Sequence, residues 1–351
     1  MEKKTLQLSF SSISVQSRRT KSEFFDQIKE LLDWKLIEKE IRKYYTKGIS
    51  VSGRRSYSGL LLFKISLLQT WYGLSDYEVE EQLYDSLSFM KFTGLTLEDD
   101  VPDHSVISRF RTILTQKKAY EKLMNHINNQ LTAKEILVKK GVIIDASITD
   151  TERKPRGKKE YEITATNADA SASKERIPPV VSVKAQSHVD TDAAWTIKRG
   201  KLRYGYKKHV ATNQEGLIVS LHTTAANESD MNYLDQVATA TATPKGTRVL
   251  ADKGYCSKEN RKTLEEKGYK DGIMHKGVRG KGLSNHQQKF NKIVSKTRYK
   301  IERTFGSIKR WFKTGIARYV GLAKMHTQHI MEAIAYNLYR APRIVVPCSQ
   351  K

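Results

Sequence analysis

The sequence predicts an α/β protein. A helical N-terminal region, residues 1–135, precedes a mixed-sheet domain, residues 136–342, and a short tail, residues 343–351. In the first region apolar residues recur at helical intervals. From Ile136 the period changes to a short, β-branched apolar run of the kind buried in the middle of a sheet. Later runs of this kind alternate with helical segments, which favours a sheet covered by helices.

The N-terminal region is predicted to consist of short helices joined by tight turns. Thr20 and Glu23 have the spacing of a capping box, which predicts that the first helix begins there. Such a region suits a helix-turn-helix-like DNA-binding domain. Packing and DNA contact are equally good roles for Arg109 and Arg111. The expected helices cover residues 20–45, 57–71, 75–86, 86–94 and 104–116.

The second region is predicted to alternate strands and helices around two irregular segments. Residues 150–187 show no sustained period and read as a mobile connection. Residues 276–292 are cationic, contain glycine and are not expected to be regular. The expected strands end at Asp145 and Asp252 and cover residues 201–213, 216–225 and 271–276, and the expected helices cover residues 232–242, 297–313 and 326–341.

The amino-acid composition and the net charge narrow the class of protein. The 62 Lys and Arg outnumber the 38 Asp and Glu, and the formal charge of +24 favours a polyanionic partner such as nucleic acid. No run of 18 or more apolar residues is present, so no membrane span is expected. The N-terminus lacks the apolar core of a signal peptide. Cys256 and Cys348 are too few for a disulfide framework or a zinc module, so we expect an intracellular protein.

Two aspartates and one glutamate are the main candidates for a functional site. Asp145 and Asp252 each end a strand-like run, where a carboxylate is rare unless it is paired or liganded. On a later expected helix, Arg298, Glu302 and Lys309 lie on one stripe. An ordinary surface pair would also explain Arg298 and Glu302. A mixed sheet with this helix packed against it would gather all three carboxylates.

Such a carboxylate set predicts metal-dependent chemistry. Three acidic groups at close range repel each other unless a divalent cation neutralises them. Hard oxygen ligands favour magnesium or manganese. Two such ions in one site can activate a water or hydroxyl nucleophile and stabilise the leaving oxygen of a phosphodiester. Arg298 and Lys309 would then hold DNA phosphates, so the residues point to phosphoryl transfer to or from DNA.

Four further residues are weaker candidates for DNA contact. Trp195, Lys198 and Lys201 precede the second expected strand, and Asn227 follows the third. Trp195 is more often a core residue than a base-stacking group. The lysines would serve as a solvated face or as a phosphate track, and the basic composition makes the two roles nearly equal.

A series of short blocks carries a family resemblance. The N-terminal blocks are WYGLSDYEVEEQLYDSLSFMKFTGL and VPDHSVISRFR, and the later blocks are DASI, DTDAAWTIKRGKLRYGYKKHVATN, TAANESD and LADKGY. The last block places three residues between Arg298 and Glu302 and six between Glu302 and Lys309. In this order the chain resembles bacterial insertion-sequence transposases of the IS-five type, a group with a ribonuclease-H-like catalytic core and an Asp, Asp, Glu triad.

The resemblance implies a role for each matching residue. Asp145, Asp252 and Glu302 would be the metal ligands, with Arg298 and Lys309 as supporting DNA contacts. The partners would be double-stranded DNA, as terminal inverted repeats and target, and a second copy of the chain in a dimer or larger assembly. The expected location is the bacterial cytoplasm, on the nucleoid when DNA is bound. The related motif often begins with a Tyr where this chain has Ser295, which leaves strand handling open.

Two other functions fit parts of the same pattern. A catalytically inactive DNA-binding protein derived from such an element would explain the charge, but loss of one triad residue would be its expected mark. A metal-dependent DNA nuclease that never joins strands would keep the same carboxylates. Only analysis of the reaction products separates a nuclease from a transposase.

Overall fold

The computed structural model describes residues 23–46, 56–138, 141–156, 161–164, 180–183, 188–278, 280 and 282–345. Thr20, half of the expected capping box, lies outside these residues. The single helix expected over residues 20–45 is two helices in the structure, α2 (Glu23–Leu31) and α3 (Trp34–Arg42). The cause is Asp33, whose carboxylate accepts hydrogen bonds from the first backbone N–H groups of α3 and caps it.

The other N-terminal helices pack around one apolar centre. Ser75 caps its helix through the capping box with Glu78, and Gly73 ends the preceding helix in a left-handed conformation. Trp71 donates a hydrogen bond from Nε1 to the carbonyl of Ala335, which ties this bundle to a C-terminal helix. The helices are α4 (Gly59–Tyr72), α5 (Asp76–Asp85), α6 (Leu87–Thr93), α7 (His104–Gln116) and α8 (Ala119–Ala133).

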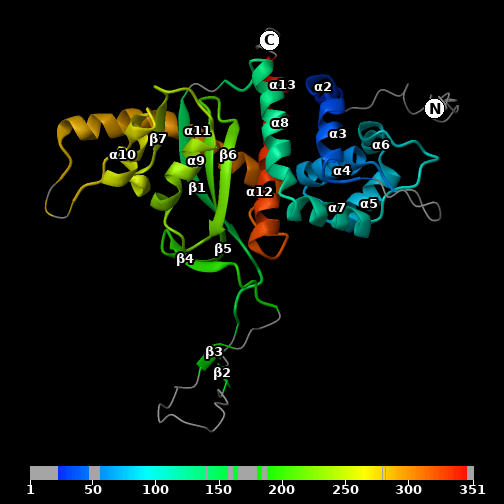
Figure 1. Ribbon diagram of the computed structural model, residues 1–351, viewed down its shortest axis with the longest axis horizontal. Helices are drawn as coiled ribbons and strands as arrows, with labels where there is room; N and C mark the ends of the chain where they lie inside the picture. The colour runs from blue at the N-terminus through cyan, green and yellow to red at the C-terminus, as the bar shows by residue number, and fades with distance from the viewer. Residues whose placement is uncertain are drawn as a thin grey trace, which may run out of the picture.

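A mixed sheet forms the centre of the second region (Figure 1). Its strands follow the order β4, β5, β1, β7, β8. β6 pairs with the part of β5 that β4 does not cover. β1 is antiparallel to β5 and parallel to β7, and β7 is parallel to β8. The strands are β1 (Val142–Asp150), β4 (Ala194–Lys198), β5 (Lys201–Thr212), β6 (Ile218–Ala225), β7 (Arg248–Ala251) and β8 (Lys270–Ile273). The mixed α/β class with a helical N-terminal region is confirmed.

The strand that carries Asp145 is longer than expected. The sequence predicted that this strand ends at Asp145, whereas β1 continues to Asp150. β5 pairs with β1 along this whole length, from Ile143 opposite Thr212 to Asp150 opposite Gly205. Polar side chains in the second half of β1 concealed a strand that is buried almost throughout.

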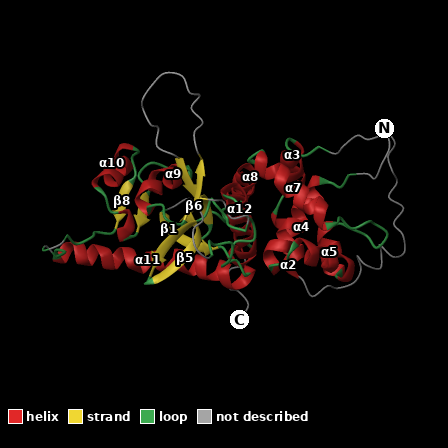
Figure 2. Ribbon diagram, turned by 90° about the horizontal axis from the view of Figure 1, so that it is seen from below, coloured by secondary structure: helices red, strands yellow, loops and turns green. Residues whose placement is uncertain are grey.

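Helices cover both faces of the sheet (Figure 2). Val142 and Ile144 pack with the cluster that contains α9 and α10 residues, whereas Ile143 packs with the cluster that contains α11 and α12 residues. Side chains alternate along a strand, so Asp145 lies on the α11 side. The remaining elements are η1 (Asp230–Tyr233), α9 (Leu234–Thr239), η2 (Lys253–Tyr255), α10 (Lys258–Glu266), α11 (Asn285–Phe312), α12 (Leu322–Arg340) and α13 (Pro342–Val345).

Two segments expected to be irregular contain regular structure. α11 begins at Asn285, inside the segment 276–292, because Ser284 and Gln287 form a capping box and Asn291 is buried. The connection 150–187 contains β2 (Tyr161–Thr164) and β3 (Val180–Val183), which pair antiparallel and lie away from the body of the protein (Figure 1).

A polar network joins α12 to the sheet. Lys208 and Glu332, 2% and 1% exposed, form an ion pair with 2.6 Å between Nζ and Oε2. Glu332 also accepts a hydrogen bond from Gln328. His329 is buried and bonded to hydroxyl groups of β1 and β6, and His326 bonds to Thr223. In the part of the chain that the structure describes, no helix is long and apolar enough to cross a membrane.

Candidate active site

The register of two parallel strands places the aspartates together. Ile144 of β1 pairs with Ala251 of β7, and Asp145 and Asp252 are the residues that directly follow this pair. Asp252 ends its strand as predicted and caps η2 by accepting a hydrogen bond from the N–H of Lys253. The two carboxylates therefore start from the same level on neighbouring strands.

Helix α11 brings Arg298 and Glu302 to the aspartates. It packs against both β1 and β7 through its buried stripe, which includes Ile301 and Phe305. Arg298 Nη1 lies 2.7 Å from Asp145 Oδ2, and its Nη2 lies 2.5 Å from Glu302 Oε1. The structure thus joins residues from β1 and α11 that are 153 positions apart in the chain.

The charges at this point are strongly coupled. Burial raises the pKa of Asp145 above its usual value, although Arg298 opposes this effect. Burial alone lowers the pKa of Arg298, but the charges of Asp145, Asp252 and Glu302 raise it overall. All three carboxylates therefore act on one guanidinium group.

The three carboxylates are the type of ligand that suits a hard divalent cation, but the guanidinium of Arg298 lies between two of them. Carboxylate oxygens are the ligands that magnesium and manganese prefer. In the described ranges, no three His, Cys, Asp or Glu side chains are close enough together to share a metal ion. Arg298 instead bridges Asp145 and Glu302. The site already holds a positive charge at the place where the sequence predicted a metal.

Two lysines flank the site along β1. Lys309 donates a hydrogen bond to the carbonyl of Ile148 at 3.0 Å, and Lys198 reaches the carbonyl of Ala146 at 3.5 Å. The charge of Lys198 also acts on Asp145. Both ammonium groups therefore contact the strand that carries the first aspartate.

Lys309 gives the site a dependence on pH. Burial, together with the charges of Lys208, Arg203 and Lys198, lowers its pKa from 10.5 to about 8. The positive charge is therefore present at pH 7 and lost as the pH rises through about 8. Because the folded state disfavours the charged form, the contribution of Lys309 to the free energy of unfolding increases between about pH 8 and 10.5.

We expect an NMR titration of lysine side chains to show signals with midpoints near pH 8 from Lys64 and Lys309, of which only the second disappears in Lys309→Gln. A midpoint near 10.5 for the signal that this substitution removes would contradict the assignment.

Two parts of the chain match models of known protein families. Residues 137–338, more than half of the chain and all of the region that holds Asp145, Asp252 and Glu302, match the family described as Transposase DDE domain. This chain belongs to the DDE transposase family. Residues 13–112 match a second model, described as Transposase domain (DUF772).

A known relative supports the same conclusion. The chain is 36% identical over 244 residues to the transposase for insertion sequence element IS1106 of Neisseria meningitidis serogroup B. The match covers 69% of this chain and 80% of the relative, which places the chain among the insertion-sequence transposases. A solved structure of piggyBac transposase, in a synaptic complex with hairpin DNA, matches with 11% identity and a TM-score of 0.39 over 91% of this chain and 75% of that one. That score is too low for the match to bear on fold or function.

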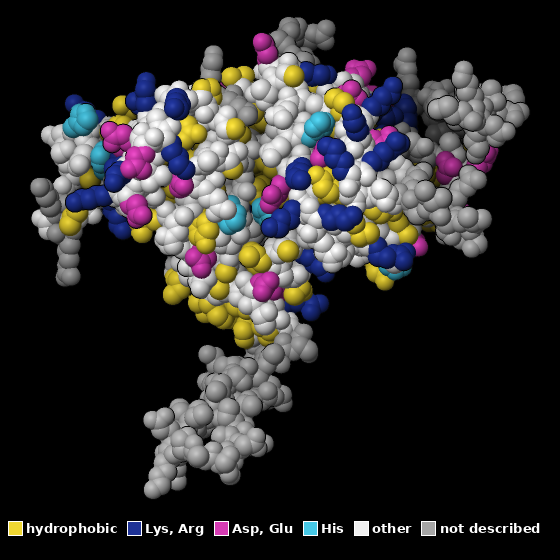
Figure 3. Space-filling model, viewed as in Figure 1, with side chains coloured by type: hydrophobic (Ala, Val, Ile, Leu, Met, Phe, Trp, Pro, Cys, Tyr) yellow, Lys and Arg dark blue, Asp and Glu magenta, His cyan; other side chains and the backbone are white. Residues whose placement is uncertain are grey.

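Trp195 is not the core residue that its type favoured. It lies in the edge strand β4, is 40% exposed, and contacts the ring of Tyr204 at a tilted angle. Ile197 and Leu202 beside it are exposed as well, and hydrophobic side chains gather at this end of the transposase in Figure 3. Its position leaves Trp195 available to a ligand. Lys201 is exposed on the neighbouring strand, and Asn227 is exposed in the turn after β6.

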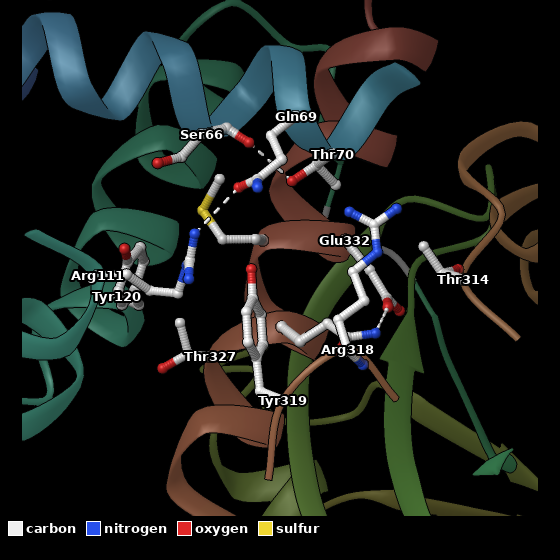
Figure 4. Close-up of a pocket in the computed structure, with 12 residues that line it drawn as sticks. Ser66, Gln69, Thr70, Arg111, Tyr120, Thr314, Arg318, Tyr319, Thr327 and Glu332 are labelled. Carbon is white, nitrogen blue, oxygen red and sulfur yellow. Dashed lines mark hydrogen bonds between the residues drawn. The ribbon is translucent and has the colours of Figure 1, made fainter. Parts of the chain in front are cut away.

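The position of Arg111 favours packing over DNA contact. It is 7% exposed and forms an ion pair with Asp76, and its guanidinium also bonds to Gln69. Figure 4 shows it in a pocket of about 30 Å³ between the N-terminal helices and α12, a volume that fits only one or two waters. Arg111 therefore packs inside the protein and does not face solvent. Arg109 is exposed on the same helix, bonded to Ser105, and stays a candidate for DNA contact.

Two residues near the triad were missed from the sequence. The pKa of Tyr255 is raised well above its usual value by burial and by the charges of Asp230, Asp145 and Asp252. Asp230 thus contributes to the same electrostatic environment, and η1, which it begins, packs against η2. Both residues lie in blocks that carried the family resemblance, TAANESD and LADKGY, but short blocks do not indicate which member approaches the site.

Proposed function

We propose that the protein cleaves the ends of its own insertion sequence and joins them to target DNA by divalent-metal-dependent phosphoryl transfer at Asp145, Asp252 and Glu302. The observation that carries this proposal is the register of β1 and β7, which sets two aspartates side by side beneath the helix with Glu302. The IS-five type, the cytoplasmic location and a dimer or larger assembly on DNA are part of the same proposal.

The reaction comprises two displacements at phosphorus. In the first, water attacks a phosphodiester at the transposon end and the 3′-oxygen leaves as a hydroxyl. In the second, this 3′-hydroxyl attacks a target phosphodiester, forms the new P–O bond and displaces a target 3′-oxygen. Two magnesium or manganese ions held by the three carboxylates would polarise the phosphodiester and activate the attacking hydroxyl.

The protein's cations position the DNA for these steps. Lys309 and Lys198 are fixed to carbonyl groups of β1 beside Asp145, where each ammonium has further donors for phosphate oxygens. Lys201 pairs with Lys198 across β5 and β4 and adds a second cation there, and Trp195 lies three positions earlier on β4. We assign residues 1–135 to DNA binding and assembly. Figure 3 shows many Lys and Arg side chains over these N-terminal helices.

The test is cleavage and strand joining on DNA with the sequences that flank this gene. With magnesium or manganese, the wild type is expected to give products that join to a second DNA, and Asp252→Ala is expected to give none. Asp85→Ala, which makes the same change at an exposed position of α5, serves as the matched control and should keep full activity.

Each alternative function predicts different products. Cut DNA that never joins would favour a nuclease. Tight binding without any product, from protein shown to be folded, would favour a DNA-binding derivative. Ser295, which stands where related motifs often have Tyr, is exposed near the start of the catalytic block, so hairpin and open-ended products should be distinguished in the same assay.

A further inference from the structure

Arg298 has a position that DNA contact alone does not explain. Its side chain is 14% exposed, and its two terminal nitrogens bond to carboxylates from different elements, Asp145 of β1 and Glu302 of α11. The charge of Asp252 acts on it as well. A residue whose role is limited to DNA phosphates would present these nitrogens outward.

We propose that Arg298 is the resident counter-cation of the carboxylate site, occupying it in the absence of DNA and leaving it to divalent cations when DNA phosphate binds the guanidinium. This inference rests on the proposed function and adds a coupling between DNA and metal that the proposed function does not require. It makes Arg298 a positioning residue for the reaction.

Electrostatics explains why the guanidinium of Arg298 and a divalent cation can compete for the same carboxylates. Asp145 and Glu302 both bond to Arg298, and the charge of Asp252 acts on it as well. Carboxylates grouped around one point repel each other unless a cation neutralises them, and the guanidinium supplies one positive charge. A divalent ion supplies more charge but must displace the bonds to Asp145 and Glu302. A DNA phosphate competes for the same N–H donors, because a guanidinium group binds phosphate and carboxylate in the same bidentate geometry.

The geometry also indicates where the guanidinium goes. Lys309 and Lys198 mark a cationic track beside β1, so phosphates held there come within reach of an arginine one helical turn before Glu302. When the guanidinium of Arg298 leaves the carboxylates to bind DNA, the net charge of the site becomes more negative. DNA and divalent cation therefore bind cooperatively, each increasing the affinity for the other by the same factor.

The experiment measures Mn²⁺ binding by electron paramagnetic resonance of the free ion, with the full chain and no DNA. Arg298→Gln is expected to bind Mn²⁺ at least about tenfold more tightly than the wild type, since a neighbouring opposite charge changes the protonation equilibrium of a carboxylate by about ten- to a thousandfold. The matched control is Lys296→Gln, which removes the same charge from an exposed position of α11 and should leave the affinity unchanged.

A second titration adds duplex DNA that carries the element's end sequence. DNA is expected to tighten Mn²⁺ binding by the wild type toward the value of Arg298→Gln, and to have a much smaller effect on the variant. Equal or weaker Mn²⁺ binding by Arg298→Gln overturns the counter-cation role, because a structural or purely DNA-binding arginine predicts that result.

The outcomes separate this inference from the proposed function. If neither the wild type nor the variant binds Mn²⁺ in the presence of DNA, the metal-dependent function itself fails. If both bind Mn²⁺ equally with and without DNA, only the coupling fails. Should Arg298→Gln not fold, Arg298→Lys carries the test, since a point-like ammonium cannot bridge two carboxylates as a guanidinium does. Its Mn²⁺ affinity should exceed that of the wild type, and an equal or lower affinity overturns the role.

Discussion

Glu302→Gln is expected to keep DNA binding and to lower the rate of end cleavage on the order of a thousandfold or more. The amide keeps the shape of the side chain but removes one negative charge and one hard oxygen donor from the carboxylate set. Glu302 is 58% exposed, so the change leaves the core untouched. Cleavage should be measured in single turnover on end-sequence DNA, with binding followed by electrophoretic mobility shift.

The matched control for this change is Glu215→Gln, which alters an exposed glutamate in the turn between β5 and β6. It should cleave like the wild type. Unchanged cleavage by Glu302→Gln would remove Glu302 from the triad. Loss of DNA binding together with cleavage would show that Glu302 acts in substrate binding.

Glu332→Gln is expected to lower the free energy of unfolding by about 3–5 kcal/mol, because it leaves the ammonium of Lys208 buried without its counter-charge. Lys208 and Glu332 are almost completely buried where β5 meets α12. Positive charge nearby adds to the penalty, since Lys208 and Lys309 already help burial to hold the pKa of His329 well below its usual value. Urea unfolding followed by circular dichroism measures the change.

An exposed ion pair provides the comparison for this prediction. Nζ of Lys262 lies 3.6 Å from Oε1 of Glu266 on α10, and the two side chains are 77% and 62% exposed. Glu266→Gln should therefore cost less than about 1 kcal/mol. A loss of similar size for Glu332→Gln would mean that water or a rearranged side chain compensates Lys208 in the core.

The sequence predicted the α/β class and the place of Asp252 because these depend on local pattern. A short apolar run followed by a polar turn defines β7 and its end. Asp145 was recognised as a candidate, but its strand was cut short. Ser147 and Thr149 looked like the start of a loop, although both are buried in β1 next to β5 and the C-terminal helices.

The pairing of Arg298 could not be predicted from the sequence. Its spacing to Glu302 indicates a helical pair, which is commonly a weak surface interaction. The bond to Asp145 depends on how α11 lies across β1, and no local pattern encodes a contact between residues so far apart in the chain. For the same reason the sequence left the role of Arg111 open and favoured the core for Trp195, since burial of a single basic or aromatic side chain is decided by distant partners such as Asp76 and Tyr204.

The bond from Trp71 to Ala335 has a consequence for shortened forms of the protein. The apolar cluster that holds the N-terminal helices also includes residues of α11 and α12, so the bundle is completed by the last third of the chain. A gene copy truncated before α12 would yield helices with an uncovered apolar face. Such fragments should be cleared by proteolysis, and decay of the element's 3′ end should therefore silence the whole protein at once.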